Sequence, residues 1–338
     1  MAVSDEQTGR KRAGQVLLLP PVHRRIFAVH SGARALWWQG MARQVEFAPA
    51  KLNLFLAVTG RRSDGFHELV SLVAPLALGD ELELETVARA SADSLVCDAP
   101  GVPVDATNLV LKAAAAFRRH AGADALPPVR FTLRKQTPAG AGLGGGSSDA
   151  AAALRGLNRL AARPLAPDAL HACAAEVGSD VPLFLAGVPV LMRGRGEKIE
   201  PLPAAARAAL RGLAVLVFKS TFGVSTAWAY QSLAARAPGG YVPASDAEAR
   251  LAAWLAAPTP ATLPLANNLE APVFAKYAAL PALLEELRAR FGLRARMSGS
   301  GSACFALLDP DHPREPIEAA IRDAWGQEAF IRATTLAG

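Results

Sequence analysis

A lysine and an asparagine interrupt an apolar run at residues 49–58, where they could form a polar site. Residues two apart share one face of a β-strand, so Lys51, Asn53 and Phe55 are expected on the same face. The opposite face would hold Leu52, Leu54, Leu56 and Val58. The pattern favours a site over solvent, although an ordinary lysine on an edge strand explains it about equally well.

Two other segments place an ionisable side chain in a turn. The turn at 60–68 carries Phe66 and His67. His67 could contact a ligand, or it could be a surface histidine whose hydrogen bonds are satisfied. The turn at 178–182 carries Asp180 directly before Val181-Pro182. Its carboxylate could accept a proton, but an aspartate that caps the backbone before a proline is the commoner role.

The sequence between residues 138 and 148 is typical of a loop that binds phosphate. It consists of Pro138, Ala139, Gly140, Ala141, Gly142, Leu143, Gly144, Gly145, Gly146, Ser147 and Ser148. Glycine lets the backbone approach an anion and point its N–H groups at it. A strand is expected before the loop, and Ser147-Ser148-Asp149 is expected to cap a helix whose positive end faces the same anion. A flexible linker is the alternative, but a capped helix rarely follows a linker at once.

Other glycine-loop families fit this run less well. Gly140, Gly142 and Gly145 have the spacing of a dinucleotide-binding fingerprint, but no acidic residue follows about 20 positions later to hold the ribose. No Lys-Ser or Lys-Thr follows the last glycine, as a Walker A loop requires. The V-A-I-K and H-R-D segments of protein kinases are missing as well. The run is therefore predicted to bind the phosphates of a nucleotide, as in a small-molecule kinase.

The hydrophobic pattern predicts an α+β fold. Strands are expected at 45–47, 51–58, 68–78, 81–87 and 129–135, helices at 107–120, 147–161 and 166–177, and a strand pair at 183–186 and 189–193 with Gly187 in its turn. A second unit would hold strands at 212–218, 293–297 and 303–308 and helices at 225–234, 246–256 and 278–291. The elements alternate without regular βαβ spacing, which argues against a doubly wound sheet.

The same pattern predicts the domain boundaries. The expected domains are 42–205, which would bind the nucleotide, and 206–338. Residues 1–41 show no clear period and are expected to be a poorly ordered extension. Met41 directly precedes a patterned strand, so it could be the natural start of the protein.

Composition excludes several classes of protein. The net charge of +6 is spread along the chain rather than gathered in a basic stripe with aromatic side chains, so no nucleic-acid partner is expected. The three cysteines are far apart and no histidines form an H-x-x-x-H pair, which argues against a disulfide framework or a metal site made by the protein alone. No apolar run reaches the roughly 20 residues of a membrane span. We therefore expect a cytoplasmic protein without a membrane partner.

Taken together, these segments resemble the GHMP kinase superfamily, to which galactokinases, homoserine kinases and mevalonate kinases belong. The resemblance covers residues from about 42 to 335. It rests on P-A-K-L-N-L-F-L at 49–56, G-R-R-S-D-G-F-H-E-L at 60–69, P-A-G-A-G-L-G-G-G-S-S-D-A-A-A at 138–152, G-S-D-V-P at 178–182 and G-S-G-S-A at 299–303. The first two, with N-N-L-E at 267–270, point to the branch whose substrate is a cytidine-diphosphate-linked methylerythritol. That branch more usually has tyrosine at Phe66 and N-D-L-E in place of N-N-L-E.

The resemblance implies a two-domain fold and a role for each site residue. The N-terminal α/β domain would be similar to a ribosomal-protein fold, and the C-terminal domain would be ferredoxin-like. Asp180 would be the catalytic base for the substrate hydroxyl, and Lys51 would keep its carboxylate ionised and orient that hydroxyl. The glycine run would hold the triphosphate of ATP with Mg²⁺. Asn53, Phe66 and His67 would line the cytidine and erythritol side.

The implied activity is ATP-dependent phosphorylation of the 2-hydroxyl of that substrate, in the non-mevalonate route to isoprenoid precursors. The protein would be a monomer or a weak homodimer. Two alternatives stay open. Another GHMP kinase, of the homoserine or mevalonate type, would share the glycine run and the last turn. An RNA-binding protein would share the N-terminal fold, although the missing basic stripe argues against it.

Overall fold

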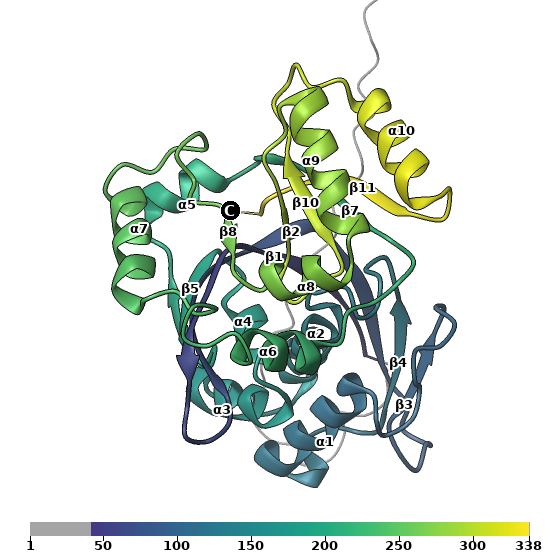
Figure 1. Cartoon of the computed structure of the whole chain (residues 1–338). Helices are drawn as coiled ribbons and strands as arrows, with labels where there is room; N and C mark the ends of the chain where they lie inside the picture. Colours follow the sequence, from purple (N-terminus) through teal and green to yellow (C-terminus); the bar gives the residue numbers. More distant parts are fainter. Residues whose placement is uncertain (1–41, 338) are drawn as a thin grey trace, which may run out of the picture. The chain divides into compact units, whose positions relative to one another are not determined.

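The computed structural model describes residues 42–337, and its first sheet is built on two long strands. β1 (Arg43–Arg61) and β2 (His67–Thr86) pair antiparallel along most of their length. Two further strands pair with β2, namely β4 (Val129–Arg134) and β5 (Val190–Gly194). β3 (Ser94–Cys97) pairs with β4, and β6 (Lys198–Pro201) pairs with β5. β8 (Ala266–Asn267) pairs with β1. β8 belongs to the second half of the chain, so this sheet is completed from a distant segment (Figure 1).

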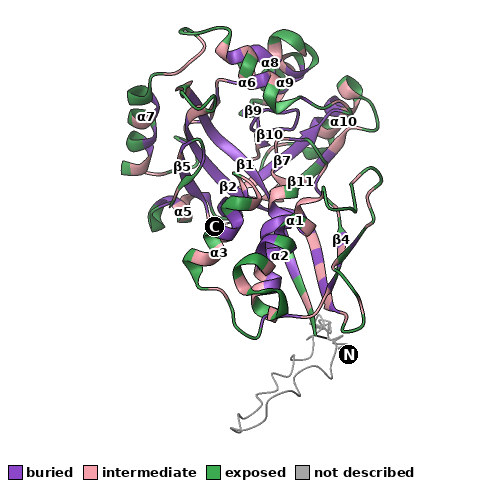
Figure 2. Cartoon of the chain, turned by 90° about the horizontal axis from the view of Figure 1, so that it is seen from below, coloured by how far each residue is buried: buried purple, intermediate pink, exposed green. Residues whose placement is uncertain are grey.

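Helices pack beneath this sheet. They are α1 (Leu109–Ala121), α2 (Gly145–Leu160), α3 (Pro167–Val177) and α4 (Val181–Ala186), and a short 3₁₀ turn (Ala123–Ala125) follows α1. α2 contacts β1, β2 and α1, with its buried face toward them (Figure 2). The alanines at 150–153 are fully buried on all sides of this helix, and their small side chains let it lie close to the sheet. The start of α2 is therefore held firmly against the strand that carries Lys51.

The second sheet comes from residues 214–335. It is antiparallel in the order β11 (Phe330–Thr335), β7 (Ala214–Lys219), β10 (Cys304–Leu307) and β9 (Ala295–Met297). The helices of this part are α5 (Ala204–Leu210), α6 (Thr226–Ala234), α7 (Ala244–Ala256), α8 (Glu270–Lys276), α9 (Ala279–Phe291) and α10 (Arg314–Trp325). α9 and α10 lie side by side, and the indole N–H of Trp325 donates to the Ala279 carbonyl at 3.0 Å.

The two sheets share an apolar core. Leu52 and Leu54 of β1 lie in the same buried cluster as Val217 of β7 and Phe305 of β10. The domain boundary at 205/206 stays a prediction. The extension predicted at 1–41 and the hypothesis about Met41 lie outside the described residues. Within residues 42–337, no helix is both long and apolar enough to cross a membrane.

Most predicted elements are present, but the strand at 183–186 is wrong. Residues 181–186 form α4, with Pro182 in its first turn, where a proline needs no backbone donor. Gly187 ends that helix in a left-handed conformation (φ 66°) rather than turning a hairpin. Only the second predicted strand, 189–193, is confirmed, as β5. Several elements have no counterpart in the prediction: β3, β6, β8, β11, α5, α8 and α10.

The predicted face of Phe55 is also wrong. The register of β1 on β2 shifts between Asn53 and Phe55, which is the mark of a β-bulge. Beyond this shift the alternation is reversed, so Phe55 is buried with Leu52 and Leu54 instead of lying on the face of Lys51. Lys51 and Asn53 precede the shift and do share a face, as their direct hydrogen bond requires.

Candidate active site

A cavity of about 570 Å³ lies where the glycine loop, β1 and several loops meet. Its walls come from the start of α2, the loop before α4, the turn between β5 and β6, α6 and the 299–300 turn. The loop before α1, including Asn108, forms another part of the wall. Lys51, Asn53 and Asp180 all line this one cavity, although they are distant in sequence.

Lys51 is buried and connects β1 to the glycine loop. Its ammonium donates to the Asn53 side-chain oxygen and, at 2.7 Å, to the Gly142 carbonyl. Its backbone N–H donates to the Leu143 carbonyl at 2.9 Å. Burial lowers the pKa of Lys51 to about 8, while the nearby Asp180 charge raises it. At neutral pH the ammonium is therefore charged but close to its titration range.

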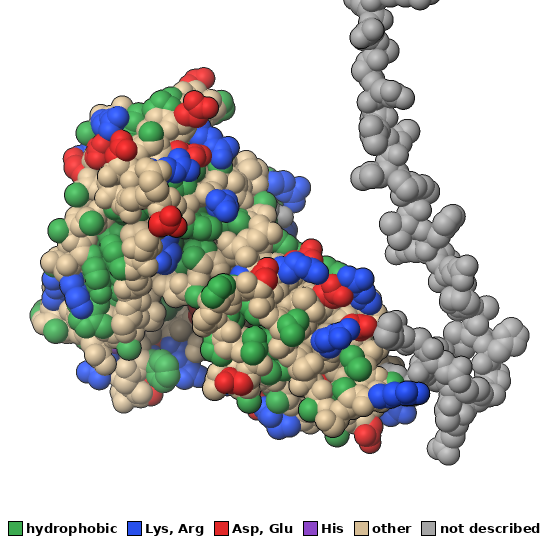
Figure 3. Space-filling model, turned by 90° about the vertical axis from the view of Figure 1, so that its right-hand side faces the viewer, with side chains coloured by type: hydrophobic (Ala, Val, Ile, Leu, Met, Phe, Trp, Pro, Cys, Tyr) green, Lys and Arg blue, Asp and Glu red, His purple; other side chains and the backbone are tan. Residues whose placement is uncertain are grey.

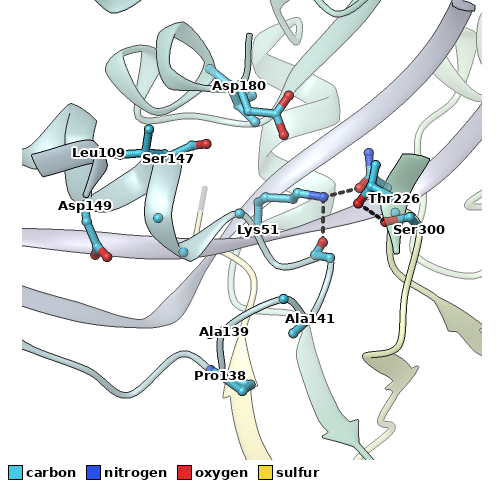
Figure 4. A pocket seen from close by; sticks show the side chains of 18 of the residues that line it. Lys51, Leu109, Pro138, Ala139, Ala141, Ser147, Asp149, Asp180, Thr226 and Ser300 are labelled. Atoms are coloured by element: carbon cyan, nitrogen blue, oxygen red, sulfur yellow. Dashed lines mark hydrogen bonds between the residues drawn. The ribbon is translucent and has the colours of Figure 1, made fainter. Parts of the chain in front are cut away.

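Asp180 lies in the turn that leads into α4. Its side chain makes no capping hydrogen bond to that helix, so the capping alternative does not account for it. The carboxylate is partly buried and lines the cavity. In Figure 4 the side chains of Asp180 and Ser147 point toward the space beside Lys51. A carboxylate and an ammonium thus face one reaction space.

Hydrogen bonds fix the orientation of the Asn53 amide. Its NH₂ group donates to the Ser71 hydroxyl at 2.9 Å, and that hydroxyl donates to the Phe55 carbonyl at 2.7 Å. The amide oxygen is thereby turned toward Lys51. Asn53 belongs to the same buried network as Lys51, so the edge-lysine alternative is wrong.

The glycine loop turns through left-handed conformations. Gly140, Gly142 and Gly144 have φ of 62°, 77° and 72°, which side chains strongly disfavour. α2 begins at Gly145 with Gly144 at its N-cap and no side-chain cap. The first N–H groups of a helix have no partner within it, and here they belong to cavity-lining residues. An anion is the natural acceptor for them.

The predicted cap Ser147-Ser148-Asp149 is therefore wrong. These residues lie inside the first turns of α2 rather than before it. Ser147 lines the cavity, but Ser148 is fully buried and does not. Leu143 also departs from the predicted role, because its side chain belongs to the core and only its carbonyl reaches Lys51. All other members of the run 138–147 line the cavity.

The turn at 298–302 packs on the glycine loop. The Ala303 N–H donates to the Ala141 carbonyl at 3.0 Å, and the Ser298 hydroxyl donates to the Gly142 carbonyl at 3.2 Å. A Cβ atom on Gly142 would lie 2.3 Å from the Ser298 carbonyl oxygen. The turn is thus more than a hairpin connection, since it supports the shape of the loop.

The motif at 267–270 holds this turn in place. The Asn267 amide donates to the carbonyls of Met297 and Gly299 at 2.8 and 2.7 Å. Asn268 accepts from the Val58 N–H at 2.8 Å, and its amide donates to the Val58 carbonyl at 2.9 Å. These asparagines join β1 to the second sheet and act as structural residues.

The turn with Phe66 and His67 lies beside the cavity rather than in its wall. Half of the Phe66 surface is exposed, and the Arg195 guanidinium lies 5.0 Å from its ring centre. The His67 ring is 5.1 Å from that of Tyr230, and burial lowers its pKa, as does the Arg61 charge. Arg195 and Tyr230 line the cavity themselves. Neither residue was predicted to belong to the site, because only the fold brings them to this turn.

A buried charged cluster supports the loop from below and was also missed. The Lys135 ammonium binds Asp80 and, at 2.8 Å, Asp149. Asp80 accepts from the backbone N–H groups of Gln136 and Thr137 at 2.6 and 2.7 Å. Burial raises the pKa of Asp149 to about 7, although Lys135 opposes this shift. The cluster fixes the strand end that leads into the loop.

Comparison with known proteins places this arrangement in a class. The family profile described as "GHMP kinases N terminal domain" matches residues 108–188, and "GHMP kinases C terminal" matches residues 251–327. The homoserine kinase structure from Cytophaga hutchinsonii has the same fold, with a TM-score of 0.63 at 20% identity over 89% of this chain and 98% of that one. The fold is that of a GHMP kinase, which confirms the predicted α+β class.

Closer relatives define the branch. A 4-diphosphocytidyl-2-C-methyl-D-erythritol kinase of Methylacidiphilum infernorum is 40% identical over 79% of this chain and 87% of its own length. A crystal structure of 4-(cytidine 5'-diphospho)-2C-methyl-D-erythritol kinase is 39% identical, with a TM-score of 0.69 over 87% of this chain and all of that one. The chain belongs to the family of 4-diphosphocytidyl-2-C-methyl-D-erythritol kinases. It is therefore an ATP-dependent kinase, as predicted.

Proposed function

We propose that this protein transfers the γ-phosphoryl group of ATP to the 2-hydroxyl of 4-diphosphocytidyl-2-C-methyl-D-erythritol. One observation supports this most directly. The Lys51 ammonium is bound to the glycine loop through the Gly142 carbonyl and faces the same cavity as Asp180. The phosphate-binding loop and the proton acceptor therefore meet at one point. Phosphoryl transfer needs mainly such positioning and charge stabilisation.

The loop binds the triphosphate through the backbone. The free N–H groups at the start of α2 and the loop backbone at 140–144 would hold its oxygens, with the positive end of the helix dipole facing them. The nucleoside of ATP then extends toward the cavity wall at 101–109, which includes Asn108. This leaves the Asp180 side of the cavity for the acceptor.

The proton moves from the acceptor hydroxyl to Asp180. As the hydroxyl oxygen forms its bond to the γ-phosphorus, its O–H bond breaks, the carboxylate takes the proton and ADP leaves. Asp180 favours the charged form of Lys51, and that ammonium stabilises negative charge on the transferred group. Asn53 keeps the ammonium in place through its side-chain oxygen.

The acceptor's cytosine would lie at the edge of the cavity, beside the turn that carries Phe66 and His67. Phe66, His67 and Tyr230 supply rings there, and the stacking of a base on aromatic rings is favourable. His67 Nε2 is buried and, within residues 42–337, has no hydrogen-bond partner. A cytosine ring nitrogen or carbonyl would satisfy it. Phe66 contributes its ring without the hydroxyl that is usual in this branch.

The residues present also fit an Mg²⁺ ion that arrives with the triphosphate. Mg²⁺ in kinases takes most of its ligands from phosphate and water and only one or two from protein. No group of three or more carboxylate, histidine or cysteine side chains is clustered for a metal within residues 42–337. The Ser147 hydroxyl lines the cavity and would hold the ion, with phosphate and water as its other ligands. The ion would neutralise phosphate charge when bound.

A panel of acceptors tests the proposal. The purified protein is incubated with ATP, Mg²⁺ and either 4-diphosphocytidyl-2-C-methyl-D-erythritol, homoserine, mevalonate or galactose, and ADP is measured. We expect ADP formation to depend on the first acceptor alone. Equal turnover of homoserine or mevalonate would favour the other GHMP kinase types.

The RNA-binding alternative has a simple thermal test, in which an ATP analogue but not RNA should raise the melting temperature. Charges on the face seen in Figure 3 are intermixed. Arginines on the strands of the first sheet also form ion pairs, such as Arg130 with Glu85 and Arg134 with Glu81. Cytoplasmic location and a monomeric or weakly dimeric state remain proposals from the sequence, to be tested by cell fractionation and sedimentation.

A further inference from the structure

An arginine at the tip of the β5–β6 hairpin has no assigned role in the reaction. Arg195 stands between Gly194 and Gly196, whose φ values of 70° and 109° make the turn tight. The Glu197 carboxylate accepts the Arg195 backbone N–H at 2.6 Å. A Cβ on Gly194 would lie 2.4 Å from that carboxylate, so little other than glycine fits there. The backbone of Arg195 is therefore fixed by its neighbours.

The base of the hairpin is fixed by a different arginine. Arg193 forms a two-pronged ion pair with Glu248 at 2.6 and 2.9 Å and a further contact with Glu200 at 3.1 Å. All three nitrogens of the Arg193 guanidinium thus take part in holding the hairpin. Arg193, and not Arg195, therefore holds the base of the hairpin in place.

The Arg195 side chain is left with its donors free. Among residues 42–337 it forms no ion pair and no side-chain hydrogen bond. Burial raises the pKa of Asp64, but the Phe66 backbone N–H, Arg62 and, least of all, the Arg195 charge lower it. The guanidinium lies 5.0 Å from the Phe66 ring centre, within the range of a cation–π contact. Arg195 also lines the cavity. A free planar cation is thus held at the acceptor side of the site.

We propose that Arg195 binds the diphosphate of the acceptor and thereby selects acceptors that carry this anion. A guanidinium binds two phosphate oxygens at once, in a geometry that an ammonium cannot reproduce. In the acceptor, the diphosphate connects the cytidine to the sugar alcohol. Arg195 lies against Phe66, and it lines the same cavity as Asp180. This inference rests on the proposed function, because it takes the acceptor to be a cytidine diphosphate derivative.

The test compares cytidine diphosphate with cytidine as binding probes. Calorimetry is performed with the ATP site filled by a non-hydrolysable ATP analogue. The variants are Arg195→Gln, Arg195→Lys and, as a matched control, Arg163→Gln, which removes an exposed arginine from a distant loop. Turnover of the complete acceptor is measured in parallel for each protein.

We expect wild type to bind cytidine diphosphate at least about 10-fold more tightly than cytidine. Arg195→Gln should remove this preference, leave cytidine affinity within twofold, and raise the acceptor KM about 10- to 100-fold, the range of a lost hydrogen bond to a charged group. The KM for ATP should stay within twofold. For Arg195→Lys, the preference for cytidine diphosphate and the acceptor KM should lie between those of wild type and Arg195→Gln. Arg163→Gln should match wild type in both.

Equal weakening of both probes in Arg195→Gln would overturn the inference, because Arg195 would then only support the Phe66 ring. An unchanged affinity for cytidine diphosphate would overturn it as well. The binding experiment does not depend on turnover. Arg195-dependent binding without phosphorylation of the acceptor would therefore refute the proposed function and leave this inference standing.

Discussion

The Lys51 ammonium donates a 2.7 Å hydrogen bond to the carbonyl of Gly142, which is 91 residues further along the chain. This contact joins the strand that carries the polar site to the loop that binds phosphate. The carbonyl also accepts from Ser298, so strand, loop and the 298–302 turn meet at one oxygen. Changes at any of the three should therefore affect binding and catalysis together.

Replacing the base should abolish most of the activity. Asp180→Asn keeps the size of the side chain but cannot accept the proton, so turnover should fall by about two or more orders of magnitude, the usual range for loss of a general base. Steady-state kinetics and circular dichroism would show lost activity in a folded protein. Asp168→Asn, an exposed change on α3, should have no effect. Near-normal turnover of Asp180→Asn would refute its assignment.

The pKa of Lys51 predicts the alkaline limb of activity. Because this pKa is lowered to about 8, the ammonium loses its proton as the pH rises through that value. In the free enzyme, kcat/KM should therefore fall about tenfold per pH unit well above pH 8. The guanidinium of Lys51→Arg stays charged over this pH range. Its activity should be weaker, but its kcat/KM should not fall above pH 8. A limb that persists unchanged in Lys51→Arg would assign it to another group.

The same shift predicts how stability depends on pH. The pKa of Lys51 is 10.5 in its ordinary state and about 8 when folded, so between these values the unfolded chain binds more protons and stability rises with pH. The full difference corresponds to about 3 kcal/mol. Urea titrations at pH 7.5 and 10.5 should show wild type gaining up to this amount relative to Lys51→Met. A constant difference between the two proteins would contradict the shift.

Two glycines of the loop should differ sharply in their tolerance of alanine. Both have positive φ, but a Cβ on Gly140 would meet nothing within 4 Å, whereas one on Gly142 would meet the Ser298 carbonyl at 2.3 Å. Gly140→Ala should cost about 1–2 kcal/mol of unfolding free energy from backbone strain alone. Gly142→Ala should cost clearly more and weaken ATP binding. If thermal and urea unfolding gave the same loss of unfolding free energy for both variants, the 298–302 turn would have to shift at little cost to admit the Cβ of residue 142.

Asn268 stands where the resemblance described above leads us to expect aspartate, and its amide makes specific hydrogen bonds. It donates to the carbonyls of Val58 and Gly240 at 2.9 and 3.0 Å, while its oxygen accepts from the Val58 N–H. An aspartate keeps only the accepting bond. Asn268→Asp should therefore lower the unfolding free energy by about 1–3 kcal/mol, from carbonyls that lose their donor. Unchanged stability would mean that these carbonyls find other donors.

The sequence alone predicts the glycine loop and the Lys51–Asn53 strand because both depend on local rules. Positive φ selects glycine, and strand periodicity places residues two apart on one face. The rule failed at Phe55, where a bulge reverses the alternation. It also failed at 183–186, because a short apolar run fits a buried helix as well as a strand.

The missed site residues depend on contacts that no local pattern records. Tyr230 lies on α6 and reaches His67 only through packing between distant segments. Lys135 resembles any strand-end lysine until Asp80 and Asp149 are found around it. Arg195 becomes a candidate binding residue only because the fold places its guanidinium beside Phe66. Such roles follow from tertiary structure, which one sequence does not contain.

The most direct measurement is phosphorus NMR of a reaction containing the protein, ATP, Mg²⁺ and 4-diphosphocytidyl-2-C-methyl-D-erythritol. The account predicts one new phosphomonoester on the 2-hydroxyl for each ADP formed, with the acceptor diphosphate intact and product formation at least about 100-fold slower with Asp180→Asn. ATP hydrolysis without a phosphorylated acceptor, or phosphorylation at another hydroxyl, would contradict it.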